Sequence, residues 1–188
     1  MMEIKKFRRT DRQGGMTLIE LMLALGILAT GLGALNVLFI TAMVTNNRNK
    51  QDTRATMLAQ LVLEKLIAEP ANDSTSITLV DCAGAVWTIA TAGAASPGAG
   101  ANIDTSSSSL SYGNIDFTQA FSSITANYKM NYVECGANGN QTTHEVRWNV
   151  MTLNTNLRLV TVASRQVGGA RRGAMFTIPV TLRSIGGH

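Results

Sequence analysis

The sequence predicts an α+β fold in which one long N-terminal helix carries a small domain built on an antiparallel β-sheet. No charged residue occurs between Leu21 and Asn47, and no proline occurs before Pro70. After Pro70 the chain changes to short segments rich in β-branched and aromatic residues, separated by Gly, Asn and Ser. We therefore divide the 188 residues into a basic leader, 1–15, a helix, 16–69, and a β-rich domain, 70–188.

The leader holds most of the positive charge of the chain, whose formal net charge is +4. It contains five basic residues, Lys5, Lys6, Arg8, Arg9 and Arg12, and two acidic residues, Glu3 and Asp11. A basic protein often binds nucleic acids or anionic membranes, but here little of the charge belongs to the β-rich domain.

The uncharged run that follows the leader is long enough to cross a bilayer, which requires about 20 apolar residues. Basic residues precede this run, and only Arg48 and Lys50 follow it closely. The positive-inside rule therefore places the N-terminus in the cytoplasm and the chain after about Thr45 on the other side of the membrane. The run has no clear A-x-A cleavage site of a secretory signal, and an uncleaved signal anchor is the alternative.

Without an interior proline, residues 16–69 can form one helix roughly 80 Å long. The second half is amphipathic, with an apolar stripe at helical spacing: Leu58, Leu61, Val62 and Leu66. We expect this stripe to pack against the β-rich domain. Pro70 and the polar cluster after it end the helix.

Five segments of the last domain have the composition of strands: Ala85–Ala90, Tyr128–Glu134, Glu145–Leu153, Leu157–Ala163 and Phe176–Arg183. Val146, Trp148 and Val150 alternate with polar residues, which predicts one apolar face. Residues 154–156 suggest a hairpin and residues 168–173 a longer connection. The sequence thus predicts an antiparallel sheet of three to five strands.

Residues 90–111 consist almost entirely of Ala, Gly, Ser and Thr. These side chains are too small and polar to build a core, so we expect a flexible surface loop.

The two cysteines, Cys82 and Cys135, form no CxxC motif, and the chain has only two histidines. This set is too small for a structural zinc site, and we expect no metal and no cofactor. Two buried free thiols are one interpretation of the pair. The position of both residues beyond the membrane, in an oxidising compartment, favours a disulfide.

The segment Gly14-Gly15-Met16-Thr17-Leu18-Ile19-Glu20-Leu21 resembles the type IV prepilin signature, apart from Met16, where that family usually has Phe. The resemblance implies that prepilin peptidase cuts between Gly15 and Met16 at the cytoplasmic face and methylates the new amine of Met16. Glycine suits the site because, without a Cβ, it lets an extended chain approach a protease closely.

Glu20 is the one charged residue of the apolar segment, and such a charge costs about a few kcal/mol at membrane depth. The resemblance implies that its carboxylate pairs with the N-terminal ammonium of a neighbouring subunit during assembly, and that Thr17 supports the pair by a hydrogen bond. The alternatives are that Glu20 merely reaches back to the headgroups and that Thr17 points outward without a role.

A second segment, 57–72, is similar to the end of the first helix in the PilV-like minor pilins. Together the two resemblances imply a minor pilin that is built into a type IV pilus or primes its assembly. The implied partners are prepilin peptidase, other major and minor pilins, the inner-membrane assembly platform and, before assembly, membrane lipid. The implied location is the bacterial inner membrane, with the C-terminal domain in the periplasm, and then the pilus or its tip.

The same leader and helix are also compatible with two related roles, a pseudopilin of a type II secretion system and a DNA-uptake minor pilin. Arg165, Arg171 and Arg172 cluster near one connection and could contact phosphates, but arginines in a Gly-rich loop are usually just solvated, so we do not expect nucleic acid as a partner. We also expect no enzymatic activity and no catalytic residues. The chain has two histidines and no phosphate-binding Gly loop, so no combination of catalytic side chains is obvious.

Overall fold

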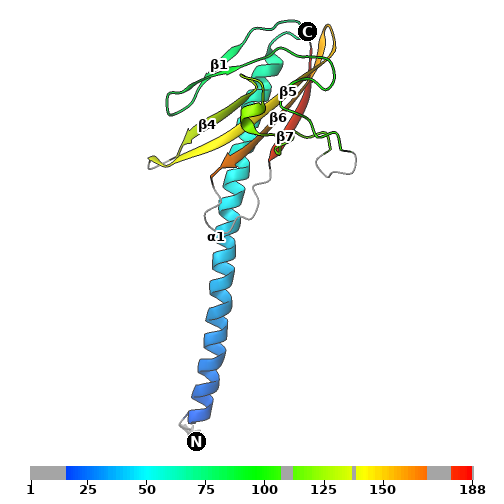
Figure 1. The fold of residues 1–188 in the computed structure, drawn as a ribbon. Helices are drawn as coiled ribbons and strands as arrows, with labels where there is room; N and C mark the ends of the chain where they lie inside the picture. Colours follow the sequence, from blue (N-terminus) through cyan, green and yellow to red (C-terminus); the bar gives the residue numbers. More distant parts are fainter. Residues whose placement is uncertain (1–15, 107–111, 137–138, 169–178, 188) are drawn as a thin grey trace, which may run out of the picture. The chain divides into compact units, whose positions relative to one another are not determined.

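The computed structural model describes residues 16–106, 112–136, 139–168 and 179–187. The chain divides into two compact units, Met1–Thr45 and Asn46–His188. The first unit contains the beginning of helix α1, and the second contains the end of that helix and all the strands (Figure 1). A long N-terminal helix followed by antiparallel sheets confirms the predicted α+β fold.

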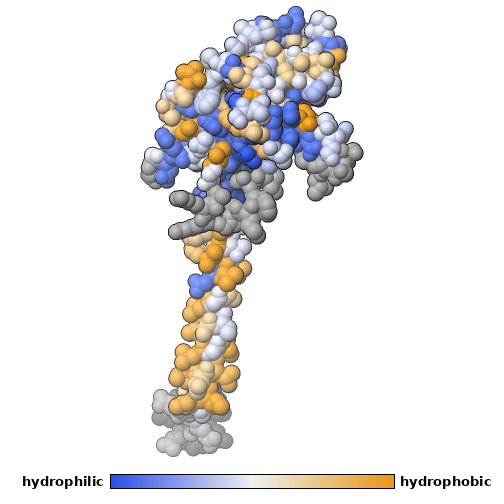
Figure 2. All heavy atoms as spheres, viewed as in Figure 1, coloured by the Kyte–Doolittle hydropathy of each residue, from blue (hydrophilic) through white to orange (hydrophobic). Residues whose placement is uncertain are grey.

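Helix α1 runs from Leu18 to Ala68, within a residue or two of the predicted bounds. Its side chains before the second unit are exposed, and Figure 2 shows apolar residues over most of its visible surface there. Six side chains near its end are buried: Ala55, Leu58, Ala59, Val62, Leu63 and Leu66. Leu61, which we expected in this stripe, is 38% exposed. Ala55 and Ala59 take part in the contact instead, because small side chains allow the helix to approach the sheet closely.

In the described part of the chain, seven strands form two sheets: β1 (Ile77–Val80), β2 (Val86–Ile89), β3 (Ala99–Gly100), β4 (Lys129–Cys135), β5 (Gln141–Asn154), β6 (Leu157–Val167) and β7 (Val180–Gly186). The first two form an antiparallel hairpin. The others form a sheet in the order β3-β5-β6-β7, with β4 also paired to β5, and all of its pairs are antiparallel. A short 3-10 helix, η1 (Phe121–Ser123), lies between β3 and β4.

Strands β5 and β6 contain the predicted segments, but β5 begins four residues earlier and β6 ends four residues later than the sequence predicts. Strands β5 and β6 form the predicted hairpin, with a two-residue turn between Asn154 and Leu157. Strand β7 begins later than the predicted segment, whose residues 176–178 lie outside the described part of the chain. The connection expected at 168–173 lies outside it from residue 169 onward.

One face of the sheet packs on helix α1. Val146, Trp148 and Val150 of β5 are fully buried and share a core with Val62 and Leu66 of the helix. The indole N–H of Trp148 donates to the carbonyl of Ala90 at 3.1 Å, so the largest core side chain also satisfies its one polar atom. This is the apolar face that the alternation in β5 predicts.

The opposite face of β5 is also buried, although its residues are polar. Arg147 is 1% exposed and Asn149 is 4% exposed. The Asn149 side chain donates to the carbonyl of Ala101 at 2.8 Å, and Arg147 donates to the carbonyl of Gln119 at 2.8 Å. Ala101 and Gln119, which both lie between β3 and β4, therefore cover this face by offering their backbone carbonyls to polar side chains of β5.

The expectation of a surface loop at 90–111 is wrong for part of that segment. Ala99–Gly100 forms strand β3 on β5, and Ala101 is fully buried. Gly100 has φ +108°, and a Cβ there would collide with the carbonyl of Trp148. Small residues are thus needed here because the backbone itself packs on the sheet. Residues 107–111 lie outside the described part of the chain.

Candidate functional site

The start of helix α1 is held by a reciprocal pair of hydrogen bonds between Thr17 and Glu20. The backbone N–H of Glu20 donates to Thr17 Oγ1 at 3.4 Å, and the backbone N–H of Thr17 donates to Glu20 Oε2 at 3.4 Å. This is the arrangement of a capping box, in which two side chains accept from N–H groups of the first helical turn. The Glu20 N–H also donates to the Thr17 carbonyl at 3.0 Å. The Thr-x-x-Glu spacing could have predicted the capping box from the sequence.

The capping box gives Glu20 a role within its own chain. In the structure its carboxylate accepts from the Thr17 N–H and, at 3.5 Å, from the Thr17 hydroxyl. These bonds are long, so a nearby ammonium group would form a stronger, charge-assisted interaction with the same oxygen atoms. The carboxylate is also exposed, together with the side chain of Met16, which precedes it by one helical turn.

The first half of α1 has the length and composition of a membrane span. Its most apolar window has a mean hydropathy of 2.2, and none of that window is buried. A soluble domain rarely exposes so many large apolar side chains, so a lipid or protein partner must cover them.

Residues 10–36 match the family model described as the prokaryotic N-terminal methylation motif. The chain therefore carries the motif of type IV pilin-like substrates of prepilin peptidase. The methylation motif and the long apolar helix together fit a pilin anchored in the inner membrane. No curated protein and no solved structure matches the chain.

The methylation motif ends within α1, so it says nothing about the β-rich domain. It covers Gly15 and Met16, between which the resemblance places the cleavage point. Gly15 lies outside the described residues, and Met16 is the first residue that the structure describes. Cleavage and methylation at this point remain predictions.

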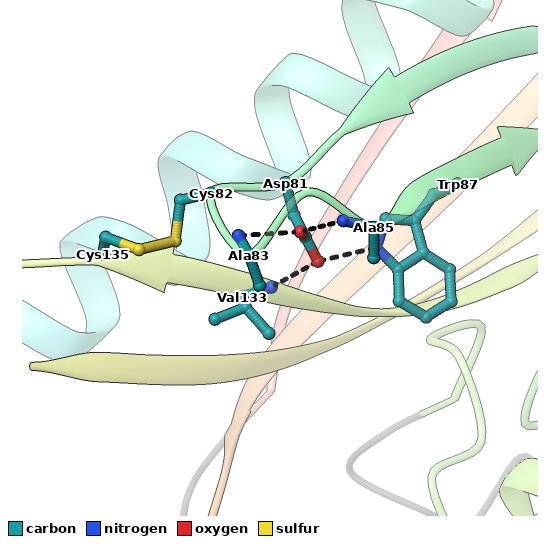
Figure 3. Close-up of a disulfide and its surroundings, with 7 residues drawn as sticks. All are labelled: Asp81, Cys82, Ala83, Ala85, Trp87, Val133 and Cys135. Atoms are coloured by element: carbon teal, nitrogen blue, oxygen red, sulfur yellow. Dashed lines mark hydrogen bonds between the residues drawn. A yellow bond between two sulfur atoms is a disulfide. The ribbon is translucent and has the colours of Figure 1, made fainter.

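Cys82 and Cys135 form a disulfide in the structure, with Cα atoms 5.8 Å apart (Figure 3). Cys82 lies in the turn of the β1–β2 hairpin, and Cys135 is the last residue of β4. The backbone N–H of Cys82 also donates to the carbonyl of Val133 at 3.3 Å. The bridge therefore fastens the two-stranded hairpin to the larger sheet.

Asp81 supports the same junction from the residue next to the disulfide (Figure 3). Its carboxylate accepts from the N–H groups of Ala83 and Ala85 within the turn, at 3.0 and 2.8 Å. It also accepts from the Trp87 indole at 3.0 Å and the Val133 backbone at 3.4 Å. Burial alone would raise the pKa of Asp81, but these donors outweigh it and lower the pKa.

Arg158 of β6 reaches the other end of α1. Its side chain is buried and donates to the carbonyls of Leu66 and Glu69 in the last turn, the latter at 2.5 Å. It also donates to the carbonyl of Thr91 at 3.1 Å. A positive charge at a helix C-terminus interacts favourably with the helix dipole. No local pattern predicts this role, because Arg158 and the helix end are far apart in the chain.

The cluster of arginines considered for DNA contact is only partly described. Arg165 donates to the buried Glu145 carboxylate at 2.9 Å and stacks over the Phe117 ring. Arg147 binds the other oxygen of the same carboxylate, so the two arginines share one negative charge within the domain. Arg171 and Arg172 lie outside the described residues. Among the described residues, no group of three His, Cys, Asp or Glu side chains could hold a metal ion.

Proposed function

We propose that the chain is a minor pilin that is incorporated into a type IV pilus or primes its assembly. Prepilin peptidase cleaves it between Gly15 and Met16 and methylates the new amine. The observation that carries the proposal is the methylation motif on a helix whose apolar side chains before the second unit are all exposed.

The geometry at the helix start supports an assembly role for Glu20. Among the described residues of a single chain, its carboxylate accepts only the long hydrogen bonds from Thr17. The ammonium group of Met16 from another subunit would supply a strong partner as the helices come together. Thr17 then keeps the Glu20 side chain near the helix end, so that exchange of partners requires little movement.

The disulfide of the β-rich domain supports the proposal that this domain is exported from the cytoplasm. A disulfide persists in the periplasm and outside the cell, and is rare in the cytoplasm. The disulfide links two segments that both follow the span. The proposed topology therefore has the N-terminus in the cytoplasm and the β-rich domain in the periplasm.

Replacement of Glu20 by Gln tests this function, because it removes the charge and keeps the shape. We expect Glu20→Gln to be cleaved normally and to enter sheared fibres at a level reduced about tenfold or more. Glu64→Gln is a matched control, because Glu64 is an exposed glutamate of the same helix that accepts a hydrogen bond from the Gln60 side chain at 3.0 Å. Normal incorporation of Glu20→Gln would contradict the pairing role.

The abundance of the chain in fibres tests the minor role separately. Quantitative mass spectrometry of sheared pili should find a methylated Met16 N-terminus, at levels far below the main pilin. If the chain is the most abundant subunit, it is the main pilin. If it is absent from pili but required for protein secretion, it is a pseudopilin.

A further inference from the structure

A polar pocket of about 260 Å³ lies between α1 and the sheet in the second unit. Four of its lining residues come from the helix and three from β5 and β6: Asn47, Lys50, Gln51 and Arg54, and Thr142, His144 and Gln166. They lie on the same face of the sheet as the apolar core, beyond the point where that core ends. The helix–sheet contact is therefore polar here.

Buried polar atoms without partners gather at this pocket. Among the described residues, Ser164 Oγ and Gln166 Oε1 have no hydrogen-bond partner, and neither does His144 Nδ1. His144 Nε2 makes no hydrogen bond of normal geometry either, but it lies 3.5 Å from Glu134 Oε2. The His144 side chain is 1% exposed. His144 pairs in register with Gln166, and Ser164 is two residues from Gln166 on the same face. Each unpaired buried polar group is unfavourable, so the pocket is suited to a polar ligand that both donates and accepts hydrogen bonds.

The charge at the pocket favours an anion. Lys50 and Arg54 are one helical turn apart on α1 and both line the pocket. Glu134 is the nearby carboxylate, and it pairs with Arg54, whose Nε lies 3.6 Å from Glu134 Oε1. Lys50 therefore adds a positive charge that Glu134 does not offset.

The position of the pocket along α1 places these cations beside a membrane surface. Asn47 is the last residue of the uncharged run and the first helical residue of the pocket. That run is about 40 Å of helix, against a hydrocarbon core of about 30 Å. Helix side chains also tilt toward the helix N-terminus, so Lys50 and Arg54 extend back toward the headgroup layer.

We propose that this pocket binds the headgroup of an anionic phospholipid of the outer leaflet, of the phosphatidylglycerol type. The phosphodiester would lie between Lys50 and Arg54, and the glycerol hydroxyls would pair with His144 and Gln166. The inference rests on the proposed function only in that the chain spends time in the membrane before assembly. It adds a lipid specificity that the methylation motif does not imply.

Native mass spectrometry of the full chain in detergent tests the proposal. The chain is mixed with equal amounts of phosphatidylglycerol and phosphatidylcholine of matched acyl chains. We expect it to retain phosphatidylglycerol preferentially. Lys50→Gln together with Arg54→Gln should lower that retention about tenfold or more, because each basic residue near an anionic surface contributes substantially. Lys65→Gln, a matched change about four turns along the same helix, should have no effect.

A second variant distinguishes specific binding of the headgroup in the pocket from nonspecific attraction of an anionic lipid to the two basic residues. Gln166→Met keeps both cations and the approximate shape, and removes the acceptor for the headgroup hydroxyl. It should lower phosphatidylglycerol retention about threefold or more, with an unchanged circular dichroism spectrum. Retention equal to the wild type would show that surface charge alone attracts the lipid, and would overturn the pocket assignment.

Two further outcomes would overturn the proposal. One is equal retention of the two lipids by the wild-type chain. The other is displacement of phosphatidylglycerol by inorganic phosphate at equal concentration, which would assign the pocket to a soluble phosphate instead. These measurements require neither cleavage nor fibres, so their failure is distinguishable from failure of the pilin proposal.

Discussion

The guanidinium group of Arg158 donates a hydrogen bond to the carbonyl of Glu69 at 2.5 Å. This bond joins strand β6 of the larger sheet to the end of α1. The same side chain also donates to the carbonyls of Leu66 and Thr91. Three carbonyls from two segments therefore depend on one residue for a donor. A helix end that is buried needs such partners, because its last carbonyls have none within the helix.

Replacement of Arg158 by Met should therefore lower the free energy of unfolding by about 3 kcal/mol, since it leaves buried carbonyls without a donor. Urea unfolding of the purified chain in detergent would measure the loss. Arg183→Met on β7 is the matched control, because Arg183 is exposed, and it should change stability by less than about 0.5 kcal/mol. Equal effects of the two changes would mean that Arg158 does not hold the helix end.

Removal of the disulfide should loosen the β1–β2 hairpin before the rest of the domain. The bridge closes a loop with a sequence separation of 53, and such loops contribute about 4 kcal/mol in the chain-entropy description. We expect Cys82→Ala with Cys135→Ala to lose about 2–4 kcal/mol of stability. Hydrogen exchange should rise in β1 and β2 while β5 and β6 stay protected. Uniform loss of protection would show that the bridge supports the whole domain.

His144 should make stability depend on pH. Burial lowers its pKa below the ordinary 6.5, Glu134 opposes this, and Arg54 adds to it. As the pH falls below about 6.5, the unfolded chain takes up the proton first. The free energy of unfolding should therefore fall from about pH 6.5 down to the folded-state pKa, below which this contribution levels off.

His144→Gln provides the comparison for this pH dependence, because it keeps a polar side chain that does not titrate. Unfolding of both chains between pH 7.5 and pH 5 would measure it, with His188 present in each. The variant should show a flatter profile over this range. Parallel profiles for the two chains would assign the pH dependence to other groups.

The parts of the fold that follow from local pattern were predicted well. The bounds of α1 follow from an uncharged run and from the absence of proline before Pro70. Strands β5 and β6 follow from alternating side chains and an Asn-rich turn. Strand β1 was not predicted, because a strand of four residues between polar neighbours shows little alternation. Its pairing with β2 depends on the turn at Asp81, whose carboxylate accepts from the Ala85 N–H.

The features that depend on distant parts of the chain were not predicted. A charged residue such as Arg147 ordinarily faces solvent, and its burial is explained by the backbone carbonyls of Asp116 and Gln119, which accept from its guanidinium group. The buried position of Ala59 in the shared core depends in the same way on the shape of the facing sheet. At the candidate site, the motif residues could be predicted, whereas the pocket at His144 exists only when α1, β5 and β6 are together.

The helix stripe at Val62 and Leu66 has a consequence for synthesis. In the proposed topology α1 enters the membrane first, yet the strands that cover the stripe are made much later: Leu66 and Arg158 are separated by 92 positions. In that topology, the end of the helix presents an apolar surface to the periplasm until β5 and β6 have been translocated. Nascent chains paused in this interval should be held by periplasmic chaperones or cut by proteases, and both should act least once the β5–β6 hairpin has closed over the helix.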